Sequence, residues 1–317
     1  MFAISAASPS CLMEIYLPVA EMSVNWLVIV ALGTGVGFMS GLFGVGGGFL
    51  MTPLLVFTGI PPTVAVATTL SHVTASSISG AITQWRKRAV DFGMAGVMAI
   101  GGMAGTLFGV WLFALMRRQG QMDLLVGLSY VVMLGSIGVI MLRESLATLK
   151  AYRSGVTISH RPVNRGWIQG LPFKMRFRQS RLYISVIPPI VLGFAVGTLS
   201  AIMGIGGGFI LVPAMIYLLR MPTKVVMGTS LVQIIVVTAI TTVLQATSNY
   251  AVDIVLAGLL VCGGVVGAQL GVRAGAKLRG EQLRLLLALL VLVVGAGLAW
   301  QLVARPVDIY SLSEGVP

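Results

Sequence analysis

Two glycine clusters are the residues in this chain whose type and spacing could do chemistry. Ser40–Leu55 reads SGLFGVGGGFLMTPLL, and Ser200–Met215 reads SAIMGIGGGFILVPAM. Glycine lacks a Cβ, so its backbone can take positive φ angles and let another atom approach its N–H groups closely. We expect short helices to begin at Phe49 and at Phe209, each presenting unpaired N–H donors and the positive end of its dipole. Held away from bulk water, these two helix ends predict a binding site for an anion.

The predicted anion is not a nucleotide. No strand is expected before either cluster, and neither cluster carries the Lys-Ser/Thr pair of a phosphate-binding P-loop. Two facing helix ends also need no Lys or Arg, which would be costly deep in a membrane. The alternative is that the glycines only allow tight helix packing. The duplication of the cluster, and its position before a short helix, favour binding.

Polar side chains on the next apolar segment of each half extend the predicted site. Thr68 and Thr69 match Thr229 and Ser230, and all four lie early on their helices, close to the expected ends of the short helices. Most other Ser and Thr side chains in these segments are expected to bond their own helix carbonyls. These four are therefore the hydroxyls predicted to reach the substrate.

A histidine inside an apolar segment is the other unusual polar group. His72 occupies the place that Gln233 takes in the second half. Imidazole titrates near neutral pH, so His72 could relay a proton or bond the substrate, and it could equally be a neutral packing residue. The complete set of predicted substrate-binding residues is Gly44, Gly46, Gly47, Gly48, Phe49, Thr68, Thr69, His72, Gly204, Gly206, Gly207, Gly208, Phe209, Thr229, Ser230 and Gln233.

The composition places these residues in a membrane protein. The chain of 317 residues is 57% hydrophobic and only 9% charged, with a mean hydropathy of +0.98. A soluble domain needs more charge to cover its surface. The net charge of +12 is interpreted as the excess of basic residues that orients loops toward the cytoplasm, and not as a surface for nucleic acid.

No catalytic, metal or cofactor site is predicted. Cys11 and Cys262 are far apart, so neither a disulfide framework nor a metal cluster is indicated. No acidic residue lies in the middle of an apolar segment, so an intramembrane enzyme would lack a paired acid and base. Asp91 and Asp253 match across the two halves and fall at helix starts, where a carboxylate stabilises the helix dipole.

The apolar segments fall into two sets of five, and short motifs repeat between the sets. Isolated spans in lipid satisfy their backbone hydrogen bonds as helices, and the second segment of each set is too short to cross alone. Five is odd, so the second half should enter the membrane with the opposite orientation. We predict an all-α polytopic membrane protein of two inverted five-segment repeats, each with a short helix after a glycine-rich tip. The segments are 23–43, 49–59, 64–84, 90–115 and 122–142, and then 183–203, 209–219, 225–247, 251–272 and 283–303.

The distribution of basic residues predicts the topology. With the N-terminus outside and each short helix returning the chain to the side it came from, most of the 21 Lys and Arg face the cytoplasm. The predicted location is the bacterial inner (plasma) membrane, and the basic linker should lie near anionic lipid headgroups, with a regulatory role as the alternative. The oligomeric state stays open. The predicted divisions are an extracytoplasmic segment 1–22, a first transmembrane repeat 23–142, a basic cytoplasmic linker 143–182, a second transmembrane repeat 183–304 and a C-terminal tail 305–317.

The chain resembles the sulfite exporter TauE/SafE family of membrane permeases. The resemblance lies in the duplicated GVGGGFLMTPLL and GIGGGFILVPAM, in ATTL and GTSL, and in AVDF and AVDI, and it covers roughly residues 24–304. It implies transport, often export, of sulfite or organosulfonates, and alternating access is the expected mechanism. The residues by themselves indicate only a small anion as partner. Alternatives are a permease for another small anion such as a carboxylate, and a non-transporting membrane assembly or sensor protein.

Overall fold

The computed structural model describes most of the two predicted repeats. Gly44, residues 1–13, most of the basic linker and the tail 305–317 lie outside the described residues. The described residues are 14–43, 46–118, 126–136, 138–139, 143, 174–177, 179, 182–219, 221, 223–275, 289 and 291–300.

The predicted apolar segments are mostly helical where they are described, although 23–43 begins with residues of a strand at 22–25 and 183–203 with residues of a strand at 182–185. Two of the helices, α2 and α8, have ten residues each, about 15 Å at 1.5 Å per residue, so the prediction of short helices is confirmed. The first half contains α1 (Trp26–Phe43), α2 (Gly48–Phe57), α3 (Pro62–Arg86), α4 (Phe92–Arg118) and the helical segment Val126–Ser136. The second half contains α7 (Ile187–Met203), α8 (Gly208–Tyr217), α9 (Thr223–Ser248), α10 (Ile254–Gly275) and the helical segment Val291–Trp300.

Two short β-hairpins correct the all-α prediction. Strands β1 (Glu14–Leu17) and β2 (Met22–Asn25) pair antiparallel just before α1, and β3 (Lys174–Phe177) and β4 (Leu182–Ser185) do so before α7. Each strand has only four residues, far fewer than the roughly 20 apolar residues that predict a membrane-spanning helix, so the hydropathy pattern does not indicate the strands. The membrane helices were predicted from sequence, and the hairpins that lead into them were not.

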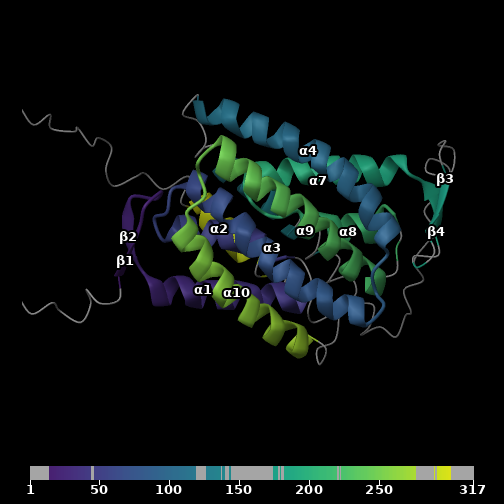
Figure 1. The fold of residues 1–317 in the computed structure, drawn as a ribbon, viewed down its shortest axis with the longest axis horizontal. Helices are drawn as coiled ribbons and strands as arrows, with labels where there is room; N and C mark the ends of the chain where they lie inside the picture. The colour runs from purple at the N-terminus through teal and green to yellow at the C-terminus, as the bar shows by residue number, and fades with distance from the viewer. Residues whose placement is uncertain are drawn as a thin grey trace, which may run out of the picture.

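The long helices pack in two groups that mix the two halves of the chain. Helix α1 packs along α10, and α4 packs along α7. Helix α3 contacts α10, α9 contacts α4, and α3 and α9 pack against each other. We call α1, α3 and α10 the first trio, and α4, α7 and α9 the second trio. Figure 1 also shows α1 leaving its hairpin at one end of the molecule and α7 leaving its hairpin at the other.

Glycines allow the helices within each trio to approach closely. A methyl group added at Gly33 would lie 2.9 Å from the carbonyl oxygen of Leu260, and one at Gly109 would lie 2.7 Å from that of Thr198. At Gly105 the added carbon would overlap the carbonyl oxygen of Phe194. Small residues at helix contacts are typical of membrane proteins, where close backbone packing replaces the hydrophobic drive between helices.

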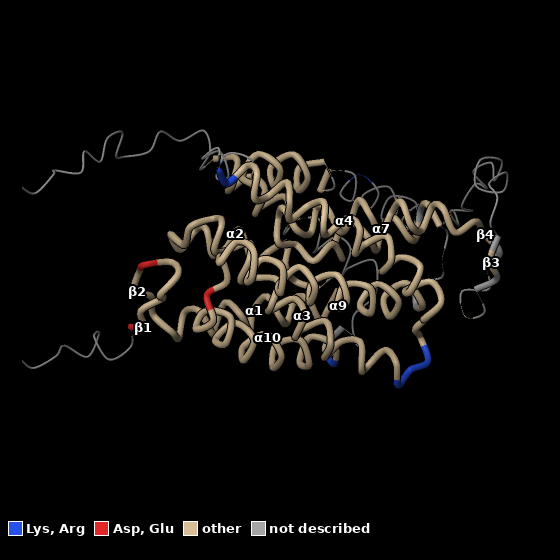
Figure 2. Tube along the Cα trace, turned by 45° about the horizontal axis from the view of Figure 1, so that its top comes forward, with Lys and Arg blue, Asp and Glu red and all other residues tan. Residues whose placement is uncertain are grey.

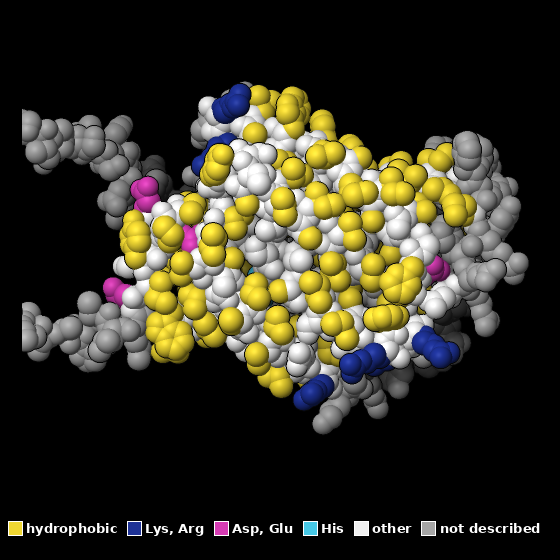
Figure 3. Space-filling model, in the orientation of Figure 1, with side chains coloured by type: hydrophobic (Ala, Val, Ile, Leu, Met, Phe, Trp, Pro, Cys, Tyr) yellow, Lys and Arg dark blue, Asp and Glu magenta, His cyan; other side chains and the backbone are white. Residues whose placement is uncertain are grey.

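The outer surface is apolar, and the charges gather at the two ends. Hydrophobic side chains cover the helices on the face shown in Figure 3. In Figure 2 the basic residues at the end of α3 and the end of α10 lie toward the end of the molecule that carries β3 and β4, while those at the end of α4 lie toward β1 and β2. Among the described residues, the helices long and apolar enough to cross a membrane are Trp26–Phe43, Phe92–Arg118, Val225–Ser248 and Ile254–Ala274.

Candidate functional site

Both glycine loops have backbone angles that only glycine adopts easily. The positive φ angles are +87° at Gly46, +67° at Gly47, +73° at Gly206 and +78° at Gly207. These angles turn the chain so that α2 starts directly after Gly47 and α8 directly after Gly207, and no side chain caps either helix. Gly204, with φ of +72°, ends α7 on the other side of the second loop.

The two loops meet in the interior of the protein. A methyl group added at Gly48 would lie 2.5 Å from the carbonyl oxygen of Ile205, so the backbones of the two loops are in direct contact. Directly after the loops, the rings of Phe49 and Phe209 stack with centroids 4.7 Å apart and an angle of 17° between their planes. Both rings are 1% exposed.

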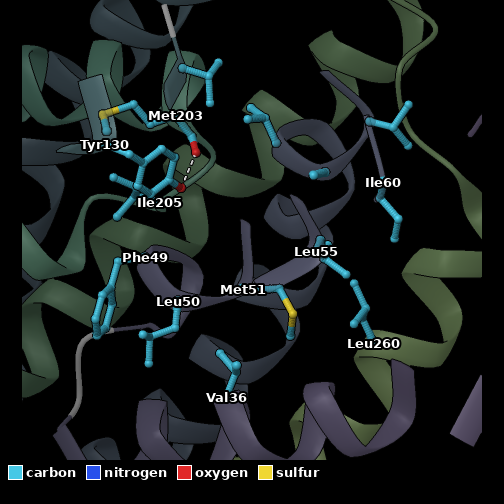
Figure 4. Close-up of a cluster of buried hydrophobic side chains, with 14 of the residues drawn as sticks. Val36, Phe49, Leu50, Met51, Leu55, Ile60, Tyr130, Met203, Ile205 and Leu260 are labelled. Carbon is cyan, nitrogen blue, oxygen red and sulfur yellow. Dashed lines mark hydrogen bonds between the residues drawn. The ribbon is translucent and has the colours of Figure 1, made fainter. Parts of the chain in front are cut away.

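A hydrophobic shell surrounds the first turn of α2. Figure 4 shows Leu50 and Met51 of this helix among buried apolar side chains, with Ile205 of the second loop nearby. Tyr130, from the helical segment Val126–Ser136, donates a hydrogen bond of 2.6 Å to the carbonyl oxygen of Met203. The uncapped starts of α2 and α8 therefore lie in a low-dielectric setting, where their dipoles act more strongly than in water.

His72 and Gln233 occupy matching positions against matching glycines. The Nδ1 atom of His72 lies 2.9 Å from the carbonyl oxygen of Leu260 on α10. That oxygen can only accept, so Nδ1 carries a proton and, in the neutral ring, Nε2 is an acceptor. The ring packs on Gly264, and the side-chain amide of Gln233 packs on Gly102 of α4. Among the described residues, neither Nε2 of His72 nor either polar atom of Gln233 has a hydrogen-bond partner.

The predicted hydroxyls at the start of α3 and α9 connect the two halves. Thr68 accepts a hydrogen bond of 3.1 Å from the backbone N–H of Asp253, and Thr229 accepts one of 3.0 Å from that of Asp91. Of their neighbours, Ser230 donates to the carbonyl oxygen of Met227 on its own helix.

Asp91 and Asp253 each cap the helix that follows. The Asp91 carboxylate accepts the N–H of Met94, and the Asp253 carboxylate accepts the N–H groups of Val255 and Leu256. Both carboxylates therefore bond donors in the first turn of α4 and of α10, as an acidic residue at a helix start does. Among the described residues, no three His, Cys, Asp or Glu side chains lie together as metal ligands would.

Comparison with known proteins places this architecture in a family. The sulfite exporter TauE/SafE family model matches residues 29–298. The chain belongs to the TauE/SafE family.

Known membrane proteins align with this chain over nearly their whole length. This TauE/SafE chain is 28% identical over 270 residues to "Probable membrane transporter protein YjnA" of Bacillus subtilis (strain 168), which covers 84% of this chain and 97% of the relative. It is 30% identical over 280 residues to a "Probable membrane transporter protein" of Xylella fastidiosa (strain 9a5c), covering 86% and 95%. No solved structure gives a significant match. With its long apolar helices, this TauE/SafE protein is a multi-pass membrane transporter.

The TauE/SafE structure brings two further residues to the glycine loops that the sequence did not single out, Ser77 through its hydroxyl and Thr238 through its methyl group. The Ser77 Oγ atom lies 3.5 Å from a methyl group added at Gly46, and the Thr238 methyl lies 3.2 Å from one added at Gly206. Ser77 and Thr238 match between the halves at the same offset as His72 and Gln233. That shared offset was the signal that could have found them.

Proposed function

We propose that this protein is a secondary transporter that exports small sulfur-containing anions, sulfite or organosulfonates, across the inner membrane by alternating access. The observation that carries the proposal is the contact between the two buried glycine loops, each followed by a helix that no side chain caps. A helix start carries about half a positive charge. The Gly48 N–H already bonds the carbonyl oxygen of Gly46 at 2.8 Å, so the attraction comes from the two dipoles and from other first-turn N–H groups, without the cost of a buried Lys or Arg.

We infer that the two halves are inverted repeats with the N-terminus outside. The matched helices α1 and α7 leave their hairpins at opposite ends of the molecule, and their contacts also match: α1 with α10, and α7 with α4. The basic ends of α3 and α10 then face the cytoplasm together with the linker. In this arrangement the loops enter from opposite sides and bring one anion site to mid-membrane.

Export of an anion in this direction needs no coupling ion. A cell interior that is negative drives each negative charge outward by about 2.3 kcal/mol per 100 mV. The positive ends of α2 and α8 would lower the cost of the anion at mid-membrane. The membrane potential would then make outward transport of the anion favourable.

Proteoliposomes test this proposal directly. We expect wild-type protein to carry sulfite and short alkanesulfonates, and Gly46→Leu and Gly206→Leu to abolish that flux, because a side chain at these φ angles strains the loop and blocks it. Gly35→Leu on α1 is the matched control, since no atom lies within 4 Å of its added carbon. Normal flux in both loop variants would remove the loops from the site. A preference for acetate or propionate over the sulfur anions would favour a carboxylate permease instead.

We further propose that His72 carries the proton if transport depends on pH. The buried Nε2 acceptor of His72, with no partner among the described residues, supports this role. His72→Gln introduces the side chain that the second half already has at the matching position. We expect it to keep flux and lose the pH dependence. Unchanged pH dependence in a folded variant would assign His72 to packing.

A further inference from the structure

We propose that four side chains from α3 and α9 line the anion site and determine its selectivity: Val73, Ser77, Ile234 and Thr238. The inference rests on the proposed transport of an anion at the glycine loops. It adds to the backbone donors the side chains that limit the size of the anion and bond it.

Val73 lies between the two loops. Methyl groups added at Gly46 and Gly48 would lie 3.5 Å and 2.6 Å from its γ-carbons, and one added at Gly206 would overlap the same side chain. Val73 is fully buried. A single branched side chain therefore contacts the first loop and the second loop at once, so the size of residue 73 limits the space that an anion can occupy.

Ser77 lies one turn further along α3, on the same face as Val73. Its hydroxyl is fully buried and has no hydrogen-bond partner among the described residues, although it faces Gly46. A buried hydroxyl without a partner carries a desolvation cost that a bound anion would remove. Ser77 is therefore the side chain that can donate a hydrogen bond to an anion at the first loop.

The matching residues on α9 complete the lining but differ in chemistry. The Cδ1 atom of Ile234 lies 3.6 Å from a methyl group added at Gly46. The Thr238 hydroxyl donates to the carbonyl oxygen of Ile234 at 2.8 Å and lies 2.8 Å from the Thr74 hydroxyl, and its methyl faces Gly206. Among the described residues, Gly46 thus faces a hydroxyl without a partner, and Gly206 faces apolar atoms. An anion would place its oxygens near Gly46 and its less polar end near Gly206.

Flux assays on the full-length protein in proteoliposomes separate the two roles. The probes are sulfite, methanesulfonate, ethanesulfonate and propanesulfonate. We expect Val73→Ala to raise the flux of propanesulfonate relative to sulfite about tenfold, because one methylene in an apolar pocket changes discrimination by that order. Val73→Ile should lower the same ratio. Val243→Ala, on the exposed face of α9, is the control and should leave it unchanged.

The hydroxyl is tested by affinity. Ser77→Ala should weaken the apparent affinity for all four probes about tenfold, since a hydrogen bond to a charged group is lost. Ser77→Thr should restore it, and Ser76→Ala should have no effect because that hydroxyl bonds its own helix at Val73. If the Gly46→Leu variant loses flux while the Val73 and Ser77 variants, folded by size-exclusion chromatography, behave as wild type, the lining is wrong and the loops remain the site. If wild-type protein carries none of the probes, the proposed transport fails and this inference fails with it.

Discussion

At the scale of single residues, the same side chain type has different tasks at neighbouring positions. Thr68 and Thr229 are completely buried and accept the N–H groups of Asp253 and Asp91, residues of the opposite half. Ser77 is equally buried, yet its hydroxyl has no partner among the described residues. The first kind of hydroxyl joins the halves, and the second kind is available to a ligand.

Removing a joining hydroxyl should cost stability. Thr68→Val and Thr229→Val keep the shape of the side chain but leave a buried N–H without its acceptor, so we expect each to lower the free energy of unfolding by about 1–3 kcal/mol. Thermal unfolding in detergent measures the loss. Thr83→Val is the control, because the Thr83 hydroxyl bonds the carbonyl oxygen of Ser79 on its own helix. Equal losses in all three variants would show that the contacts between halves add nothing.

At the scale of helices, glycine acts in two ways. At the loops it permits positive φ angles, and along α1, α4, α7 and α10 it permits close contact between backbones. Close helix packing requires no special backbone angle. It is lost only when a side chain that replaces the glycine collides with the neighbouring helix. Glycines on the outer face of the same helices, such as Gly96 of α4, have nothing within 4 Å of an added carbon.

Two alanine substitutions on α4 should therefore have different effects. Gly105→Ala places a methyl group onto the Phe194 carbonyl of α7, so we expect a loss of about 1–3 kcal/mol from forced separation of the helices. Gly96→Ala adds a methyl group in open space and should be neutral or slightly stabilising, since alanine favours helix more than glycine does. Denaturant unfolding of both variants in the same detergent compares them. The opposite order would contradict the packing of α4 on α7.

At the scale of the whole molecule, the units that could move are not the two halves of the sequence. The first trio takes α1 and α3 from one half and α10 from the other, and the second trio mirrors this choice. Alternating access predicted from the repeats would move one repeat-derived bundle against the other. The mixed trios define a second motion to be tested, of one trio against the other, even though α3 contacts α9 more extensively than it contacts α10.

Paired cysteines can distinguish these motions. The hydroxyls of Thr74 on α3 and Thr238 on α9 are 2.8 Å apart, and those of Thr106 on α4 and Thr241 on α9 are 3.4 Å apart. In a background without Cys11 and Cys262, we expect a disulfide in Thr74→Cys/Thr238→Cys to stop transport until it is reduced. A disulfide in Thr106→Cys/Thr241→Cys joins helices of one trio and should not stop it. Each single-cysteine variant serves as control, and equal inhibition by both disulfides would contradict motion between trios.

The orientation of the whole molecule is tested by labelling from each side. With the N-terminus outside, a membrane-impermeant maleimide added to intact cells should label Arg118→Cys, at the end of α4, and should leave Lys87→Cys, just after α3, unlabelled until the membrane is opened. The physical basis is the excess of Lys and Arg on the cytoplasmic side. The reverse labelling pattern would show that the N-terminus is cytoplasmic. Labelling of both cysteines in intact cells would place the ends of α3 and α4 on the same side of the membrane.

The sequence predicted what depends on local chemistry and missed what depends on helix rotation. The described glycines of both loops, and the short helices after them, follow from composition and repetition. Ser77 and Thr238 were not singled out, because a hydroxyl on a long apolar helix faces the site or its own backbone according to packing that no single segment specifies. Thr68 was predicted to face substrate, and the structure shows its hydroxyl at Asp253, because the interlocking of two halves brings together residues far apart in the chain.

The stacked rings of Phe49 and Phe209 impose a condition on any cycle of conformations. They join the first turns of two helices from opposite halves, and a parallel stack loses its contact when one ring slides away from the other. The paired short helices would then behave as a fixed hub, while the surrounding helices swing to uncover it from alternate faces. In such a transporter the anion would stay bound at the short helices while access to it changes from one side of the membrane to the other.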